Sequence, residues 1–206
     1  MELQVADVIQ WMEKSNDSIQ ANKDYLSSLD RAIGDGDHGI NMARGFQEVV
    51  SKLTTSDYQT VSDVLKDVSM TLLSKVGGAS GPLFGTAFLK MSTTVKGMEK
   101  VDANQLGEAF QEALNGIKLR GKANKGDKTL VDVWEPVVEF FKSSDSIDAN
   151  ALAEVAKQAM ESTKELEARR GRAAYLKERS IGHLDPGSVS SYYIFTALSE
   201  VLQKGA

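Results

Sequence analysis

The chain has no cysteine, only three prolines and two histidines among its 206 residues. Without thiols it can form no disulfide, no zinc–thiolate site and no iron–sulfur cluster. It also lacks an excess of positive charge. The formal net charge is −5, which argues against nucleic acid or an anionic membrane as its main partner.

Long apolar runs are also missing. No stretch approaches the ~20 apolar residues that a membrane-spanning helix needs. The N-terminal stretch has an acid at Glu2 and no basic region followed by an apolar core, so we expect no signal peptide. The length and composition predict a single globular domain over residues 1–206, located in the cytoplasm.

Apolar residues recur at spacings of three and four along nearly the whole chain, as between Val61 and Val76. This period is typical of amphipathic helices, and strand-like alternation is hard to find. Asp102 and Asp148 are placed to cap helix N-termini, and Pro186 stands at the first position of another helix. The pattern predicts an all-α fold of about eight helices.

The connections between the predicted helices differ in composition. The connection Met98–Val101 is interpreted as an ordinary short linker, but four other connections are rich in glycine or charge. These four are Gly34–Gly39, Gly77–Gly81, Gly121–Lys128 and Gly171–Gly187. Because antiparallel helices bring alternate connections to the same end of a bundle, several of these loops could converge on one site.

The first of these loops lies within "DRAIGDGDHGINM", residues 30–42, after a helix predicted to end near Leu29. Asp30, Asp35 and Asp37 offer only oxygen ligands, which suit a hard cation such as magnesium. A single Asp-Gly pair would be explained by a solvated turn. Three aspartates separated by flexible glycines favour a metal site.

The second loop lies within "SKVGGASGPLFGTAFLK", residues 74–90. Ser80 is placed to cap the helix that begins near Gly81. Free amides at a helix N-terminus, together with the helix dipole, form an anion site. A plain capped turn is the alternative. Together with a magnesium site in the same chain, however, this loop predicts a site for nucleotide phosphates.

Four segments resemble the nucleotide-binding domain of dihydroxyacetone kinases, and they occur in that family's order between residues 30 and 187. They are "DRAIGDGDHGINM", "GGASGPLFGT", "GKANKGDKTLVDVWEP" and "RRGRAAYLKERSIGHLDPG". The free-standing form of this domain is the ADP-binding L subunit of the phosphotransferase-system (phosphoenolpyruvate)-dependent enzyme. The resemblance implies an antiparallel barrel of about eight helices, with nucleotide bound in loops at one end.

The resemblance also implies roles for individual residues. Asp30, Asp35 and Asp37 match the aspartates that hold two magnesium ions (Mg²⁺). Arg172 is a candidate for stabilising charge on the transferred phosphoryl group, whereas His38 is expected to contact nucleotide without carrying phosphate. The positions that match nucleotide contacts are His38, Gly39, Ile40, Asn41, Ala79, Ser80, Gly121, Leu130, Arg172, Asp185, Pro186 and Gly187.

In the family, ADP is a retained coenzyme. The resemblance implies that a phosphocarrier M subunit recharges it to ATP, with phosphate that originates from phosphoenolpyruvate. The γ-phosphate then passes to dihydroxyacetone on a K subunit. Alternatives are a subunit of an ATP-dependent triose or fatty acid kinase, a nucleotide-sensing regulator of a transcription factor, and a metal-dependent hydrolase. A homodimer is also left open.

Other conspicuous side chains are interpreted as structural or solvated. The lysines of the 121–128 loop are expected to be solvated, with contact to phosphates or to an acidic partner as the alternative. Two arginines are expected on the surface, a loop histidine is expected to be structural, and three aromatic residues are expected in the core. These residues are Arg169, Arg170, His183, Trp134, Tyr192 and Tyr193.

Overall fold

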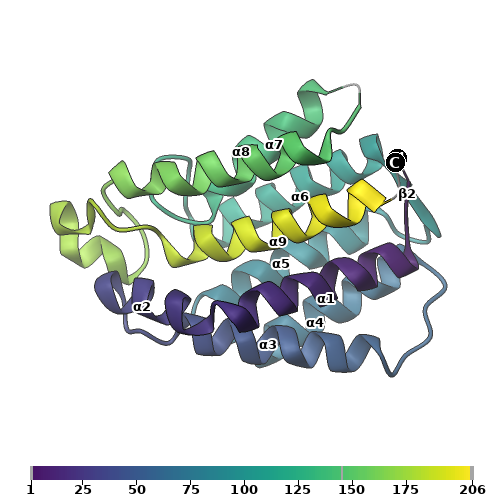
Figure 1. Cartoon of the computed structure of the whole chain (residues 1–206), viewed down its shortest axis with the longest axis horizontal. Helices are drawn as coiled ribbons and strands as arrows, with labels where there is room; N and C mark the ends of the chain where they lie inside the picture. The colour runs from purple at the N-terminus through teal and green to yellow at the C-terminus, as the bar shows by residue number, and fades with distance from the viewer. Residues whose placement is uncertain (1, 145, 205–206) are drawn as a thin grey trace.

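The computed structural model describes residues 2–144 and 146–204, which contain nine α-helices and very little sheet (Figure 1). The helices are α1 (Val5–Ala21), α2 (Lys23–Ile33), α3 (His38–Leu53), α4 (Val61–Lys75), α5 (Ser80–Thr94), α6 (Ala103–Gly121), α7 (Val131–Ser143), α8 (Ala149–Ser162) and α9 (Pro186–Lys204). Two 3₁₀ segments, η1 (Thr163–Glu165) and η2 (Arg172–Ser180), lie between α8 and α9. The predicted all-α class is confirmed. Within the described residues, no helix is long and apolar enough to cross a membrane.

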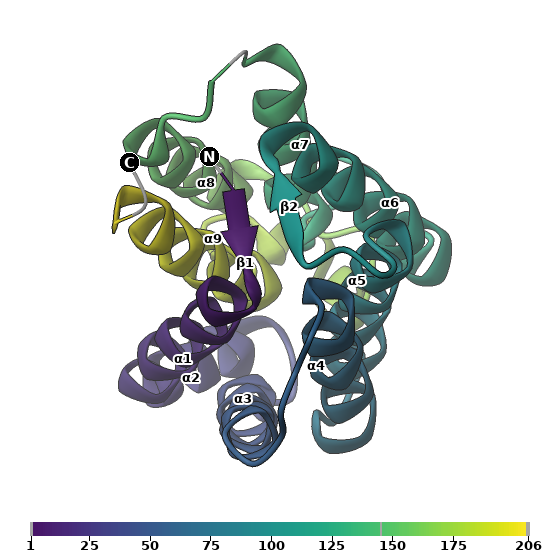
Figure 2. The same cartoon turned by 90° about the vertical axis from the view of Figure 1, so that its right-hand side faces the viewer.

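Eight of the helices form a closed ring, which Figure 2 shows from one end. Contacts run from α1 to α3 and then through α4, α5, α6, α7 and α8 to α9, which packs against α1 and closes the ring. Helix α2 lies outside this sequence of neighbours and contacts α3, α9 and η2. The predicted barrel of about eight helices is therefore confirmed, with α2 as an addition to it.

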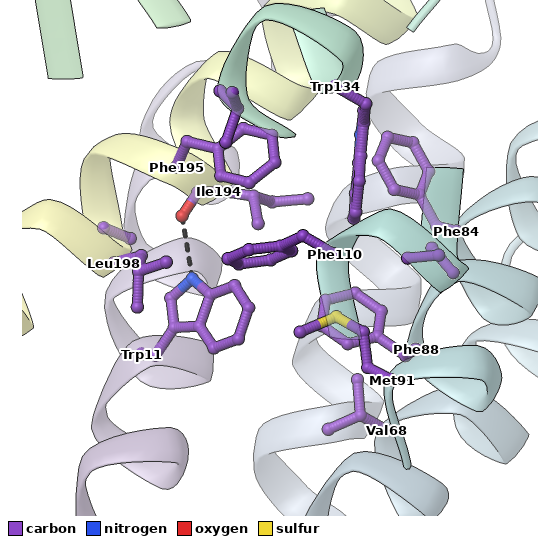
Figure 3. Packing of buried hydrophobic residues seen from close by; sticks show 14 of the residues in the cluster. Trp11, Val68, Phe84, Phe88, Met91, Phe110, Trp134, Ile194, Phe195 and Leu198 are labelled. Atoms are coloured by element: carbon purple, nitrogen blue, oxygen red, sulfur yellow. Dashed lines mark hydrogen bonds between the residues drawn. The ribbon is translucent and has the colours of Figure 1, made fainter. Parts of the chain in front are cut away.

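The inside of the ring is filled by aromatic and aliphatic side chains (Figure 3). Phe110 is at the centre of the aromatic group, with ring centroids 6.2 Å from Trp11, 6.1 Å from Trp134 and 5.5 Å from Phe195. The buried Trp11 Nε1 donates a hydrogen bond of 2.8 Å to the Ile194 carbonyl and so joins α1 to α9. The expected core position of Trp134 is confirmed, since its side chain is fully buried.

The two ends of the barrel differ. One end carries a two-stranded antiparallel sheet of β1 (Glu2–Gln4) and β2 (Lys100–Asp102), in which Leu3 pairs with Val101. The connections α2–α3, α4–α5 and α6–α7 and the segment between α8 and α9 lie at the other end (Figure 1). The interpretation of Met98–Val101 as a plain linker is wrong, because β2 begins inside it. A three-residue strand is too short for alternation to reveal it.

The N-terminal helical region is divided into two helices, and the second extends beyond Leu29, near which the sequence predicted a helix end. Helix α1 ends at Ala21. The side-chain amide of Asn22 donates a hydrogen bond of 2.8 Å to the Ser18 carbonyl, which satisfies one of the free acceptors at the helix end. Helix α2 then continues to Ile33. As a result Asp30 lies in the last turn of a helix and not in a loop.

The predicted helix starts are confirmed. The Asp102 carboxylate accepts a hydrogen bond of 2.9 Å from the amide of Gln105 at the start of α6. The Asp148 carboxylate accepts 3.1 Å from the amide of Ala151 in α8. Pro186 is the first residue of α9. These caps are local, which is why they can be read from sequence.

We expect Phe110→Ala to lower the free energy of unfolding by about 3–5 kcal/mol, because it removes a fully buried ring from the centre of the barrel. Leu119→Ala on the same helix is the control, since Leu119 is 81% exposed; its effect should stay within about 0.5 kcal/mol. Urea unfolding followed by far-UV circular dichroism measures both. Equal losses for the two variants would contradict this description of the core.

Candidate functional site

A pocket of about 690 Å³ opens at the barrel end opposite the small sheet. All four connections that the sequence marked as rich in glycine or charge contribute to its lining, so their predicted convergence is confirmed. The volume is in the range of small-molecule sites. One part of the lining is acidic, one part is the N-terminus of α5, and one part is apolar. The apolar part includes Leu83, Ile117, Ala123, Leu130 and Val131.

The acidic part consists of Asp30, Asp35 and Asp37. One carboxylate oxygen from each lies within 4.8 Å of the others. Asp30 is buried at the end of α2, where its Oδ2 accepts a hydrogen bond of 3.0 Å from the backbone amide of His38. Gly34 makes this turn possible, because a Cβ there would lie 2.1 Å from Asp30 Oδ1.

The three carboxylates fit a divalent cation. Burial raises the pKa of Asp30, and the charges of Asp35 and Asp37 raise it further, although the amide of His38 opposes the shift. A cation would relieve both the burial cost and the repulsion, and an all-oxygen ligand set suits magnesium or calcium. Arg172 already offers partial compensation, since its Nη2 lies 2.9 Å from Asp35 Oδ2. The Arg172 side chain is largely exposed.

His38 joins three helices beneath the pocket. Its Nε2 lies 2.7 Å from Ser190 Oγ of α9, and its Nδ1 lies 3.1 Å from Ser80 Oγ of α5. Burial lowers the pKa of His38 to about 4, so the imidazole is neutral at physiological pH. Both ring nitrogens have hydrogen-bond partners, which is consistent with an orienting role for this side chain.

The prediction that Ser80 caps α5 is wrong. The helix begins at Ser80 itself, and the N-cap residue is Ala79, with no side-chain capping bond. The hydroxyl of Ser80 is instead used by His38. The predicted anion-binding geometry does not depend on this cap, because Gly77, Gly78, Ala79 and Ser80 all line the pocket at the N-terminus of α5.

Two predicted nucleotide contacts do not line the pocket. Gly39 packs against α2, where a Cβ would lie 2.0 Å from the carbonyl oxygen of Lys23. Ile40 is 56% exposed on α3. Every other predicted site residue lines the pocket. These are Asp30, Asp35, Asp37, His38, Asn41, Ala79, Ser80, Gly121, Leu130, Arg172, Asp185, Pro186 and Gly187.

Sequence reasoning missed several cationic residues of the pocket. Arg170 is exposed, as expected, and its Nε lies 3.3 Å from Asp127 Oδ2, but its side chain also lines the pocket. Arg120 also lines it. Lys128, expected to be solvated, is only 1% exposed, whereas Lys125 of the same loop is exposed. No pattern in the sequence distinguishes Lys128 from the other lysines of this loop.

Asp185 is a second perturbed carboxylate of the pocket. It precedes α9, and its Oδ2 accepts a hydrogen bond of 2.6 Å from the amide of Ser188. Burial raises the pKa of Asp185 to about 7, and the positive charge of Lys128 opposes this shift. Burial likewise lowers the pKa of Lys128. A carboxyl group whose pKa is raised to about 7 therefore lines the pocket.

The fold and pocket define a class of all-α barrel with a carboxylate cluster and a helix N-terminus facing one ligand site. More particularly, the chain matches the DAK2 domain family over residues 32–200 and belongs to that family. The match begins two residues after Asp30.

Relatives of similar length share about half of the sequence. The chain is 50% identical over 190 residues to PEP-dependent dihydroxyacetone kinase 1, ADP-binding subunit DhaL, of Listeria innocua, covering 92% of this chain and 93% of that one. It is 42% identical over 205 residues to PEP-dependent dihydroxyacetone kinase, ADP-binding subunit DhaL, of Escherichia coli, covering 97% and 98%. These matches confirm the resemblance drawn from the four segments and the prediction of a phosphotransferase.

A solved structure supports the fold. The dihydroxyacetone kinase from C. freundii in complex with AMP-PNP and Mg²⁺ superposes with a TM-score of 0.76 at 24% identity. The match covers 95% of this chain and 34% of that one. At this identity the likeness shows the fold alone.

We expect Asp185→Asn to change how stability depends on pH. The folded-state pKa of about 7 exceeds the unfolded value of 3.8. The contribution of Asp185 is therefore fully present below pH ~4 and is lost as the pH rises through ~7. The variant keeps an acceptor for Ser188 and should gain about 2–4 kcal/mol relative to wild type between pH 4 and pH 8.

Thermal unfolding across this pH range measures the difference. Asp148→Asn is the matched control, since Asp148 is also a helix-capping aspartate but is exposed. Because asparagine caps helices about as well as aspartate, its difference from wild type should stay within about 0.5 kcal/mol. A flat difference for Asp185→Asn would show that the carboxyl group titrates in its ordinary range.

Proposed function

We propose that this chain is the ADP-binding subunit of a phosphoenolpyruvate-dependent dihydroxyacetone kinase. The observation that supports this best is the pocket itself. Its lining includes both the carboxylates of Asp30, Asp35 and Asp37 and the N-terminus of α5, which are the parts that a magnesium–nucleotide site needs. The relatives named as such subunits match over nearly their whole length.

Each part of the lining has a role in this proposal. Asp30, Asp35 and Asp37 hold two Mg²⁺, which when bound supply charge neutralisation to the nucleotide phosphates and to the phosphoryl group in transfer. The backbone amides of Ala79 and Ser80 bind phosphate oxygens at the start of α5. Gly121 and Leu130 lie on the apolar part of the lining, which suits the base.

Arg172 contributes a mobile positive charge. In the structure it pairs with Asp35. With nucleotide bound, this guanidinium would be available to a phosphate oxygen, where it would offset developing negative charge. His38 remains neutral and fixes the relative positions of α3, α5 and α9.

The proposal includes two protein partners. A phosphocarrier M subunit recharges the retained ADP in place, and a K subunit presents dihydroxyacetone for transfer of the γ-phosphate. The chain acts in the cytoplasm as one domain over residues 1–206. The pocket opens at the end of the barrel, where a partner can approach without entering the core.

We expect the purified protein to bind ADP only in the presence of Mg²⁺. Asp35→Asn and Asp37→Asn should each weaken ADP binding by about 100-fold or more, because each removes a charged oxygen ligand. Isothermal titration calorimetry with ADP and MgCl₂ measures this, and mass spectrometry of the denatured protein identifies any nucleotide that copurifies.

Asp24→Asn is the control, since Asp24 is an exposed aspartate on α2 that does not line the pocket. It should bind ADP as wild type does. Far-UV circular dichroism should be the same for all variants. No ADP binding by the wild-type protein with Mg²⁺ would refute the proposal.

Reconstitution distinguishes the proposed role from its alternatives. We expect dihydroxyacetone phosphate to form from phosphoenolpyruvate only when both K and M subunits and the general phosphotransferase proteins are present. Asp35→Asn should abolish turnover. Turnover with the K subunit and free ATP, without M, would indicate an ATP-dependent kinase instead. Nucleotide binding without turnover in either mixture would indicate a sensor.

A further inference from the structure

Lys128 occupies an unusual place in the fold. Its side chain is 1% exposed, although lysine is rarely fully buried. Its Nζ donates one hydrogen bond of 2.7 Å to the carbonyl of Thr163 and another of 2.9 Å to the carbonyl of Leu166. These carbonyls follow the C-terminal end of α8, where a cation is favoured by the helix dipole. Lys128 therefore connects the α6–α7 loop to the chain that leaves α8.

The loop that carries Lys128 is itself held firmly. The buried carboxylate of Asp132 accepts a hydrogen bond of 2.5 Å from the amide of Gly126 and another of 2.7 Å from the amide of Thr129. These bonds come from residues on both sides of Lys128. Its backbone has a φ of +60°, which is uncommon for a side chain with a Cβ and is maintained by this surrounding structure.

The neighbour of Lys128 makes a second attachment to the same chain segment. The carbonyl of Asp127 accepts a hydrogen bond of 3.0 Å from the amide of Arg169, and Asp127 Oδ2 lies 3.3 Å from Arg170 Nε. We call residues 166–172 the arginine segment. Lys128 fixes its first residue, and Asp127 fixes Arg169 and Arg170 near its end.

The arginine segment ends at Arg172, the residue that reaches the carboxylate cluster. Arg172 stands two positions after Arg170, and its Nη2 lies 2.9 Å from Asp35 Oδ2. With Arg170 attached to Asp127, little free chain remains between the attachment and the guanidinium. The position of Arg172 over the site thus depends on the pair Asp127 and Lys128.

We propose that Lys128 is a positioning residue, which acts on bound nucleotide through the arginine segment and Arg172. The inference rests on the proposed function. A direct phosphate contact is disfavoured, because the ammonium group is buried and already donates to two carbonyls. A role in stability alone would not make its effect depend on Arg172.

A double-mutant cycle on ADP affinity with saturating Mg²⁺ tests this. The proteins are wild type, Lys128→Gln, Arg172→Ala and the double variant. We expect Lys128→Gln to weaken ADP binding about 10-fold in the wild-type background, and less than about 2-fold when Arg172 is already alanine. Calorimetry measures the affinities, and circular dichroism confirms folding at the assay temperature.

Lys125→Gln is the matched control, since Lys125 lies in the same loop, is exposed and pairs at 3.5 Å with Glu139 outside the pocket. It should bind ADP as wild type does. If Lys128→Gln fails to fold, Asp127→Asn replaces it in the cycle, because this change weakens the attachment of Arg170 and keeps an acceptor for the amide of Asn124.

The possible results are distinct. A loss of affinity that disappears in the Arg172→Ala background supports the proposal. A loss of the same size in both backgrounds overturns it, since Lys128 would then act on the nucleotide directly or through the whole fold. No loss in the wild-type background also overturns it. Absence of binding by the wild-type protein would refute the proposed function itself, and this inference with it.

Discussion

The functional end of this protein depends on keeping three carboxylates together. Asp30, Asp35 and Asp37 each place an oxygen within 4.8 Å of the others, and at that separation their charges repel strongly wherever water is excluded. Neighbouring groups offset part of this repulsion. The amide of His38 donates to Asp30, and the guanidinium of Arg172 pairs with Asp35. The repulsion that these groups leave uncompensated would be relieved by a divalent cation.

The barrel provides the rigidity that this arrangement requires. The closed ring of eight helices is filled by large side chains around Phe110, and the small sheet lies at the far end. The connections at the pocket end are thereby held at fixed positions without contributing much to the core themselves. His38, bonded to Ser80 and Ser190, ties α3, α5 and α9 directly beneath the pocket. Stability and chemistry are thus assigned to different parts of the molecule.

Much of this could be predicted from the sequence, because the relevant signals are local. The 3.6-residue period gave the helices, and side-chain caps such as Asp102 and Asp148 gave their starts. The carboxylates could be recognised because a solvated turn does not require three aspartates between glycines, whereas a hard cation does require several oxygen ligands. The family resemblance then supplied the barrel, which periodicity alone does not determine.

The features that were missed depend on contacts between distant parts of the chain. The buried Lys128 donates to the carbonyls of Thr163 and Leu166, and Arg170 in the pocket lining pairs with Asp127. Nothing within the 121–128 loop distinguishes one lysine from another. Ser80 likewise looked like a helix cap, because its partner, His38, is 42 positions away in sequence.

The position of α2 outside the ring has a thermodynamic consequence. Asp30 belongs to α2, whereas Asp35 and Asp37 follow it in the connection to α3. A cation bound by all three would therefore join the end of α2 to the connection that leads into α3, which is a helix of the ring. By linkage, whatever free energy such a cation gains from Asp30 would also stabilise the arrangement of α2 relative to that connection. Binding of such a cation and the placement of this helix would then be a single equilibrium.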